Sequence, residues 1–432
     1  MILLTCDHPK RELKALTQIK KKLERKKINC KIINKALIIK AYNLYKPKII
    51  TIPHTLRYLI NPINVLKNKV KIIMIPTESC IMVDKFIEMQ YCNIFPNFKK
   101  PSNHNKVDYF LTQSDYTSKY LKKKKLIKKN LISTGFIYFD YWYNQKFKKK
   151  NTTKNIGIAL TNELPLRFYN SKNFVKNFRN SHKDTDYIEN SWRLKQFNYD
   201  LYYLSLIFKI VEKIPKNCVI NIRLHPLDAQ TNMAEVFKNN PNVIVDNNTK
   251  IQEWIQNQDV IVSTFSSIYI DSYIFRKPHI SLINLIPESF LEFKAYNSHS
   301  YRDYHEYYSN KPTNFKSFIK ILRNSKFKKN INFEKKLFKY YSYPNKQKAV
   351  ERVSENLSKI YDKTNVKFQY KFINNLQKFL TMILGNKITS LLIFYLSEIK
   401  LYFLPHTNKS YYSNFTYYGM KIPYIIYKLI KK

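Results

Sequence analysis

Two stretches of the sequence decide the fold: CVINIRLHPLD at residues 218–228 and DVIVSTFSSIYIDSYIFRKPHISLI at residues 259–283. Each opens on a short apolar run, and polar segments of helix length follow these runs. Short buried strands that alternate with helices are typical of βαβ units and of a parallel sheet. The spacing predicts strands at Cys218–Arg223, Val243–Asp246, Val260–Ser263 and His279–Ile283, and helices at Ala229–Lys238, Ile251–Gln256 (capped by Thr249) and Ser267–Phe275.

The same alternation continues on the N-terminal side of these stretches. Asn155–Leu160 is predicted as a strand and Tyr199–Lys213 as an amphipathic helix. The first 140 residues repeat the pattern, with predicted strands Ile2–Cys6, Ile28–Ile33, Lys48–Ile52, Val70–Ile75, Val107–Thr112 and Leu131–Thr134 and helices Glu12–Lys26 and Ser118–Lys129. Two such series predict an α/β protein with two Rossmann-like domains facing a cleft.

The polar, lysine-rich stretch Gln145–Lys154 separates the two series and is predicted to be a linker. We therefore expect an N-terminal domain at residues 1–144, a second domain at 155–364 and a basic, aromatic-rich helical tail at 365–432. The most apolar part of the tail, Leu391–Leu404, is shorter than the ~20 residues of a spanning helix. The tail could lie on an anionic inner leaflet or pack back on the second domain, and both alternatives stay open.

The composition excludes several classes of nucleotide-binding protein. With 4 glycines in 432 residues, the chain has no glycine-rich dinucleotide, Walker or kinase loop. Its 5 cysteines form no CxxC pair, which favours a reducing, cytoplasmic compartment over a zinc ribbon or a disulfide framework. A net charge of +46 indicates a polyanionic partner, but lysine dominates it. Because arginine is preferred for specific phosphate and base contacts, we do not expect dedicated nucleic-acid binding.

The run Arg223-Leu224-His225-Pro226 stands at the carboxyl end of a predicted strand. In open α/β sheets this is the end where ligands bind. Arg223 and His225 are two positions apart and share a face if the strand continues, while the proline ends the ladder and exposes the imidazole. A histidine that merely ends a strand is the alternative.

The next strand but one ends at Ser263-Thr264, and Ser266-Ser267 then open a helix. Hydroxyls and free backbone N–H groups at a helix start can hold a phosphate. Asp271 follows one turn later, where it could accept hydrogen bonds from ribose hydroxyls. The alternative is a serine cap followed by a solvated aspartate.

A carboxylate also follows a strand of the first series, at Glu78 in the sequence IPTES. A carboxylate facing a cleft can act as a general base, although a loop glutamate is the plain alternative. The DxD pattern at Asp184–Asp186 lies in a polar stretch and not at a strand end, so we assign it no metal. No metal or other cofactor is expected.

Taken together, these motifs resemble those of bacterial surface carbohydrate biosynthesis proteins. These are similar to the GT-B-like group that holds Kdo transferases, sialyl- and polysialyltransferases and glycerophosphate transferases. The resemblance covers roughly residues 70–285 and rests on PTES (76–79), LISTGFIYFDYW (131–142), NIGIALTNE (155–163), INIRLHPLD (220–228) and residues 259–282.

The resemblance assigns roles residue by residue. Glu78 matches the family's acid, with Ser79 in place of a glycine, and Gly135 and Asp140 match a motif in which Phe136-Ile137-Tyr138 replace Asn-Pro-Arg. The other matches are Thr161 and Asn162 (a small polar pair), Arg223, His225 and Pro226 (basic-x-His-Pro), and Ser266, Ser267 and Asp271 (the hydroxyl pair and its acid).

The resemblance implies a metal-independent glycosyltransferase that makes a cell-surface polysaccharide. Its partners would be a nucleotide-sugar donor, with a CMP-activated acidic sugar as first choice, and a saccharide or lipid-linked acceptor. It would act in the cytoplasm or at the inner face of the membrane. A glycerophosphate or other phosphodiester-forming transferase is the nearer alternative, and a non-catalytic nucleic-acid- or membrane-binding protein is the more distant one.

Overall fold

The computed structural model describes residues 1–7, 9–55, 60–77, 82–92, 94–95, 98–99, 104–128, 130–142, 154–160, 187–215, 217–224, 233–246, 248–264, 266–287, 289, 309–343 and 347–364. By its contacts the chain divides into two units, and both large sheets lie in the unit formed by Met1–Asn170 and Ser191–Val366. The account below concerns that unit.

The first sheet has six parallel strands in the order β2-β1-β3-β4-β7-β8. They are β1 (Ile2–Cys6), β2 (Cys30–Asn34), β3 (Ile49–Ile52), β4 (Lys71–Met74), β7 (Tyr109–Thr112) and β8 (Leu131–Ser133). Central strands covered on both faces are expected to be continuous apolar runs, and β1 and β3 are buried along their whole length. The strand order reverses between β1 and β3, which makes this edge the topological switch point of the sheet.

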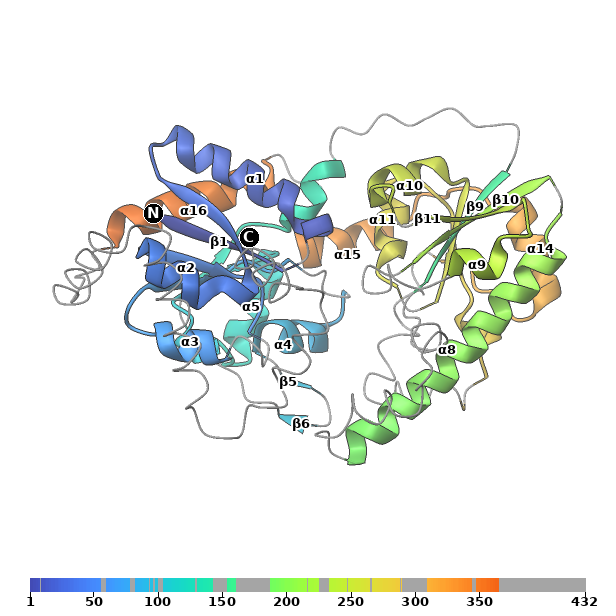
Figure 1. Cartoon of the computed structure of the whole chain (residues 1–432), viewed down its shortest axis with the longest axis horizontal. Coiled ribbons are helices and arrows are strands. Elements are labelled where there is room, and N and C mark those ends of the chain that lie inside the picture. The colour runs from blue at the N-terminus through green and yellow to red at the C-terminus, as the bar shows by residue number, and fades with distance from the viewer. Residues whose placement is uncertain are drawn as a thin grey trace, which may run out of the picture. The chain divides into compact units, whose positions relative to one another are not determined.

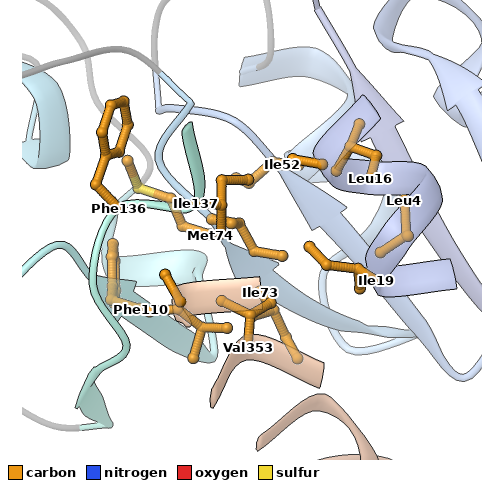
Figure 2. Close-up of a cluster of buried hydrophobic side chains, with 14 of the residues drawn as sticks. Leu4, Leu16, Ile19, Ile52, Ile73, Met74, Phe110, Phe136, Ile137 and Val353 are labelled. Atoms are coloured by element: carbon orange, nitrogen blue, oxygen red, sulfur yellow. The ribbon is translucent and has the colours of Figure 1, made fainter. Parts of the chain in front are cut away.

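Helices and a small hairpin surround this sheet. They are α1 (Pro9–Arg25), η1 (Lys35–Leu37), α2 (Ile38–Tyr45), α3 (Ile60–Leu66), α4 (Asp84–Cys92), η3 (His104–Lys106), α5 (Asp115–Lys123), η4 (Ile137–Trp142) and the antiparallel pair β5 (Ile94–Phe95) and β6 (Phe98–Lys99). Leu16 and Ile19 of α1 lie on one helix face and pack in the same core as Leu4, Ile73 and Met74 of the strands (Figure 2).

The second sheet has five parallel strands in the order β11-β10-β9-β12-β13, the doubly wound arrangement of Rossmann-like folds. They are β9 (Lys154–Ala159), β10 (Cys218–Arg223), β11 (Val243–Asp246), β12 (Val260–Ser263) and β13 (His279–Ser281). Its other elements are α8 (Tyr187–Lys213), α9 (Met233–Phe237), α10 (Ile251–Asn257), α11 (Ile268–Ile274), η6 (Ile283–Leu285) and α14 (Phe315–Asn324). The switch point lies between β9 and β12.

The last two described helices connect both sheets to one core. In α15 (Ile331–Tyr341), Phe333 packs on Tyr273 of the second sheet's α11, while the Tyr340 hydroxyl donates to Asp84 of α4 at 2.8 Å. The final helix, α16 (Ala349–Lys363), returns to the first sheet and packs beside α1 (Figure 1). Residues 349–363 were predicted as part of the second domain, yet their partner is the first sheet.

The predicted fold class is confirmed, since two parallel sheets of Rossmann-like topology are present. Three local predictions are wrong. The helix expected at Tyr199–Lys213 is α8, which starts twelve residues earlier, at Tyr187. The lysine-rich helix expected at Ser118–Lys129 is α5, which starts earlier because the Ser114 side chain accepts from the Thr117 N–H and caps it. The cap of α10 is Lys250 and not Thr249, whose backbone N–H donates to the Asp246 carboxylate at 2.9 Å.

The predicted domain boundaries stay predictions. Most of the linker predicted at 145–154 and all of the tail predicted at 365–432 lie outside the described residues. Within the described residues, none of the helices combines the length and the hydrophobicity required to cross a bilayer.

Candidate functional site

Polar side chains gather where the strands of the second sheet end. Ser263 is the last residue of β12, and its Oγ shares a 2.8 Å hydrogen bond with Nε2 of His279 on β13. The next residue, Thr264, accepts a hydrogen bond from the Tyr199 hydroxyl of α8. Both side chains are fully buried, and their hydroxyls form hydrogen bonds with buried side chains of the core.

The two serines that follow are less buried and stand before α11. The Ile268 N–H donates to Ser266 Oγ at 3.3 Å, while Ser267 is the cap residue of α11 but makes no side-chain cap hydrogen bond. The helix has seven residues, two fewer than the nine predicted for Ser267–Phe275. Since the macrodipole acts within the first turn, this short helix offers a bound anion little beyond its N–H groups.

Asp271 lies one turn into α11 and is 8% exposed. Its Oδ1 atom is buried and has no hydrogen-bond partner among the described residues. Because burial disfavours the charged form, the pKa of this carboxyl is raised to about 8. At neutral pH the side chain is therefore mainly a neutral acid, which is a different group from the carboxylate acceptor that the sequence analysis assumed.

Arg223 closes β10, and its guanidinium carbon lies 5.8 Å from the centre of the Trp254 ring. Its Nη1 atom is buried and unpaired within the described part of the chain. Burial lowers the pKa of this guanidinium, and electrostatic attraction to Asp246 and Tyr138 opposes that shift. A guanidinium that keeps its charge and has unused donors is suited to an anionic ligand.

A cavity of about 90 Å³ brings several of these elements together. Its lining residues come from the end of β4, from η4 and from α11: Thr77, Phe136, Tyr138, Phe139, Ser267, Ile270 and Asp271. Ser267 and Asp271 thus share one cavity, and Arg223 interacts electrostatically with Tyr138 in its wall. Ser263 and Thr264 are not among the lining residues.

Four predicted site residues lie outside the described residues: Glu78, Thr161, Asn162 and His225. Glu78, Thr161 and His225 directly follow the last described residues Thr77, Leu160 and Leu224, and Asn162 comes one position after Thr161. The Leu160 N–H donates to the Arg223 carbonyl at 3.0 Å, so the residue before Thr161 and the residue two positions before His225 are neighbours across the sheet. The described residues hold no group of three or more histidine, cysteine or acidic side chains that could bind a metal ion.

One polar cluster was not predicted from the sequence. At the switch point of the first sheet, Asp7 follows β1 and His54 follows β3, with His54 Nε2 3.1 Å from Asp7 Oδ2. Lys35 forms an ion pair with the same carboxylate, and the Asp7 N–H donates to Glu12 at 2.7 Å. Burial alone would raise the pKa of Asp7, but the hydrogen bonds from His54 and Lys35 outweigh it and hold the pKa well below its usual range. Asp7 and His54 are 47 positions apart in the sequence and form no local motif. The one sequence signal for this pair is that each residue follows a buried strand.

Comparison with known proteins adds a family and a fold. A family model described as CDP-glycerol:poly(glycerophosphate) glycerophosphotransferase matches residues 80–359. A search of curated proteins finds no match. The wall teichoic acid polymerase TagF, in a variant form, is 12% identical with a TM-score of 0.51, covering 84% of this chain and 89% of that chain. The UDP-GlcNAc 2-epimerase of Methanocaldococcus jannaschii, in complex with UDP-GlcNAc and UDP, is 15% identical with a TM-score of 0.50, covering 83% and 99%. At these identities the likeness concerns the fold, which is GT-B-like.

Proposed function

Because the chain belongs to the CDP-glycerol:poly(glycerophosphate) glycerophosphotransferase family, we propose that it transfers glycerophosphate from CDP-glycerol to a cell-surface polymer. The observation that carries the proposal is the extent of the family match. Residues 80–359 include Arg223, Ser267, Asp271 and the η4 wall of the cavity. The alternative of a phosphodiester-forming transferase is thereby favoured over transfer of a CMP-activated acidic sugar, the first choice from the resemblance.

The proposed reaction exchanges one phosphodiester link for another. An acceptor hydroxyl oxygen attacks the phosphorus that carries glycerol, and a new P–O bond forms. The P–O bond to the bridging oxygen of the diphosphate breaks, and CMP leaves. The hydroxyl proton passes to a base. Negative charge builds up on the departing CMP, so a site for this reaction needs positive charge and hydrogen-bond donors beside the diphosphate.

The second sheet supplies those groups in the proposal. Arg223, whose buried Nη1 atom lacks a partner within the described residues, would contact the diphosphate. Ser266 and Ser267 would donate hydroxyl hydrogen bonds to it, and Asp271 would contact hydroxyls of the donor. Ser263 and Thr264, bonded to His279 and Tyr199, would fix the end of β12 from behind.

The remaining roles fall on residues outside the described part of the chain. His225 would donate a hydrogen bond or a proton to the departing phosphate, and Glu78 would take the proton of the acceptor hydroxyl. Thr161 and Asn162 would line the same edge beside β9. These assignments rest on the resemblance and on position after the strand ends.

The charge of the chain fits a polyanionic acceptor. Poly(glycerophosphate) carries one negative charge per unit, and the chain has a net charge of +46. We propose that this excess holds the growing polymer near the site. A peripheral contact of residues 365–432 with an anionic inner membrane remains a separate prediction, tested by sedimentation with liposomes with and without those residues.

Donor binding tests the proposal. We expect CDP-glycerol and CDP to raise the unfolding temperature of the purified protein in a concentration-dependent way. CMP-activated sialic acid or Kdo should give a smaller shift. No response to cytidine nucleotides, combined with saturable and strongly salt-dependent binding of nucleic acid, would favour the non-catalytic alternative.

A further inference from the structure

Two buried polar atoms that lack hydrogen bonds belong to residues lining the same cavity. Thr77 Oγ1 and Asp271 Oδ1 have no partner among the described residues, and the two side chains are 3% and 8% exposed. Buried polar groups in folded proteins nearly always have a partner, because losing water without replacement is costly. Two unpartnered groups at one cavity, contributed by the end of β4 and by α11, therefore indicate a ligand that supplies their partners.

The cavity is the size of a small fragment. A volume of about 90 Å³ holds about three water molecules at the ~30 Å³ that each occupies in the liquid, which suits a fragment such as a diol and not a whole nucleotide. Part of the wall is apolar, from Phe136, Phe139 and Ile270 (Figure 2 labels Phe136). The fragment that fits is compact, with carbon on one side and hydroxyls on the other.

The described wall favours an uncharged fragment over a phosphate inside the cavity. Among the described lining residues there is no cation, and the titratable groups are Asp271 and Tyr138, with Arg223 interacting with Tyr138. Burial raises the pKa of Asp271 to about 8, so at neutral pH its carboxyl offers one donor and one acceptor. The Thr77 hydroxyl also offers both. Two donor–acceptor groups match two adjacent hydroxyls, which are themselves donors and acceptors.

We propose that this cavity binds a vicinal diol of the donor through the side chains of Thr77 and Asp271. The inference rests on the proposed function for the identity of the donor. CDP-glycerol carries two such diols, in its ribose and at the end of its glycerol. The chemistry required of the cavity is the same for both, and the experiment separates them.

The test measures the dissociation constant of CDP-glycerol by calorimetry at pH 7 and pH 9. The neutral fraction of a group with a pKa of about 8 falls about tenfold across this interval, so wild-type affinity should fall about tenfold. D271N keeps a donor and an acceptor but cannot ionise. It should bind at least tenfold more tightly than D271L at pH 7, and its affinity should be the same at both pH values, which separates the effect of Asp271 from that of every other group.

Thr77 has an equally close pair of variants. T77V removes the hydroxyl at nearly constant volume and should weaken binding about tenfold, which is the usual contribution of a neutral hydrogen bond. T77S keeps the hydroxyl and should weaken binding less than threefold. Unfolding temperatures of all four variants show whether each is folded.

Two further ligands identify the diol. If it is the ribose, T77V weakens CDP and CDP-glycerol alike, and the 2′-deoxy analogue of CDP-glycerol abolishes the difference between T77V and wild type. If it is the glycerol, T77V weakens CDP-glycerol and leaves CDP as in wild type. Either pattern supports the proposal. Two results overturn the proposal, provided that the wild-type protein binds CDP-glycerol. One is that D271N binds CDP-glycerol as weakly as D271L does. The other is that T77V binds every ligand with wild-type affinity. A wild-type protein that binds none of the three ligands overturns the proposed function itself.

Discussion

The carboxylate of Asp140 accepts the backbone N–H of Val350 at 2.6 Å and the N–H of the preceding residue, Ala349, at 2.8 Å. These are the first two N–H groups of α16, which have no partner within their own helix. An aspartate 210 positions earlier in the chain thus fastens the last described helix to the first sheet. In the family resemblance this aspartate ends the GFIYFD segment, and the structure gives it a role in the fold.

We expect Asp140→Ala to lower the free energy of unfolding by about 1–2 kcal/mol, the usual effect of losing a helix cap. Urea denaturation followed by circular dichroism measures it. Asp362→Ala, at an exposed position of the same helix, should change stability by less than about 0.5 kcal/mol. Equal effects of the two substitutions would show that the Asp140 cap contributes nothing.

Gly135, in the same segment, has a φ of +83°, and an added Cβ would lie 2.4 Å from Arg352 Nη2 and 3.3 Å from Ala349 Cβ. Gly135→Ala should therefore cost about 1–2 kcal/mol from backbone conformation alone, plus the displacement of Arg352. In an Arg352→Ala background the added cost of Gly135→Ala should shrink but not vanish. A Gly135→Ala protein as stable as wild type in urea would contradict this description of the turn.

The Asp7 cluster predicts a specific acid sensitivity. The pKa of Asp7 is held below its unfolded value of about 3.9. The contribution of Asp7 to the free energy of unfolding is therefore present above pH 4. It is lost as the pH falls further, because the Asp7 carboxylate takes up its proton at a higher pH in the unfolded chain than in the folded one. Asp7→Asn should be less stable than wild type by about 3 kcal/mol at pH 7, and the difference should narrow between pH 4 and pH 2.5. Parallel stability curves over that range would refute the ion pair.

Much of the fold could be predicted because buried parallel strands are continuous apolar runs. The bounds predicted for β1, β10, β11 and β12 agree with the structure residue for residue. Amphipathic helices were predicted less well, since a surface lysine fits a helix or a turn equally. The segment Lys124–Asn130 illustrates this: Lys125 and Asn130 have positive φ and the helix has already ended.

Contacts between distant segments could not be predicted in the same way. Asp140 meets Val350, and Asp7 meets His54, through the topology of the sheets and not through any local pattern. The site shows the same division. Position after a strand end singled out Ser267 and Asp271, and the structure places both at one cavity, where their roles stay predictions. It could not show that Ser263 and Thr264 are fully buried or that burial raises the pKa of Asp271.

Arg223 should matter for donor affinity more than for folding. Its Nη1 atom has no partner in the described residues, so a bound diphosphate would supply one. Arg223→Lys keeps the charge but loses the planar contact with Trp254, and we expect it to weaken CDP binding about 10- to 100-fold, the range for a hydrogen bond to a charged group. Arg25→Lys, at an exposed position of α1, is the matched control and should bind CDP as wild type does. Unchanged CDP affinity in Arg223→Lys would remove Arg223 from the site.

The most direct measurement follows both products of the proposed reaction. Purified protein is incubated with CDP-glycerol and a poly(glycerophosphate) primer, and released CMP is compared with glycerophosphate added to the polymer. The account predicts that the two amounts are equal and that His225→Ala slows both about 10²- to 10⁴-fold, the usual contribution of a general acid. Release of CMP from an activated acidic sugar, with CDP-glycerol left intact under the same conditions, would contradict it.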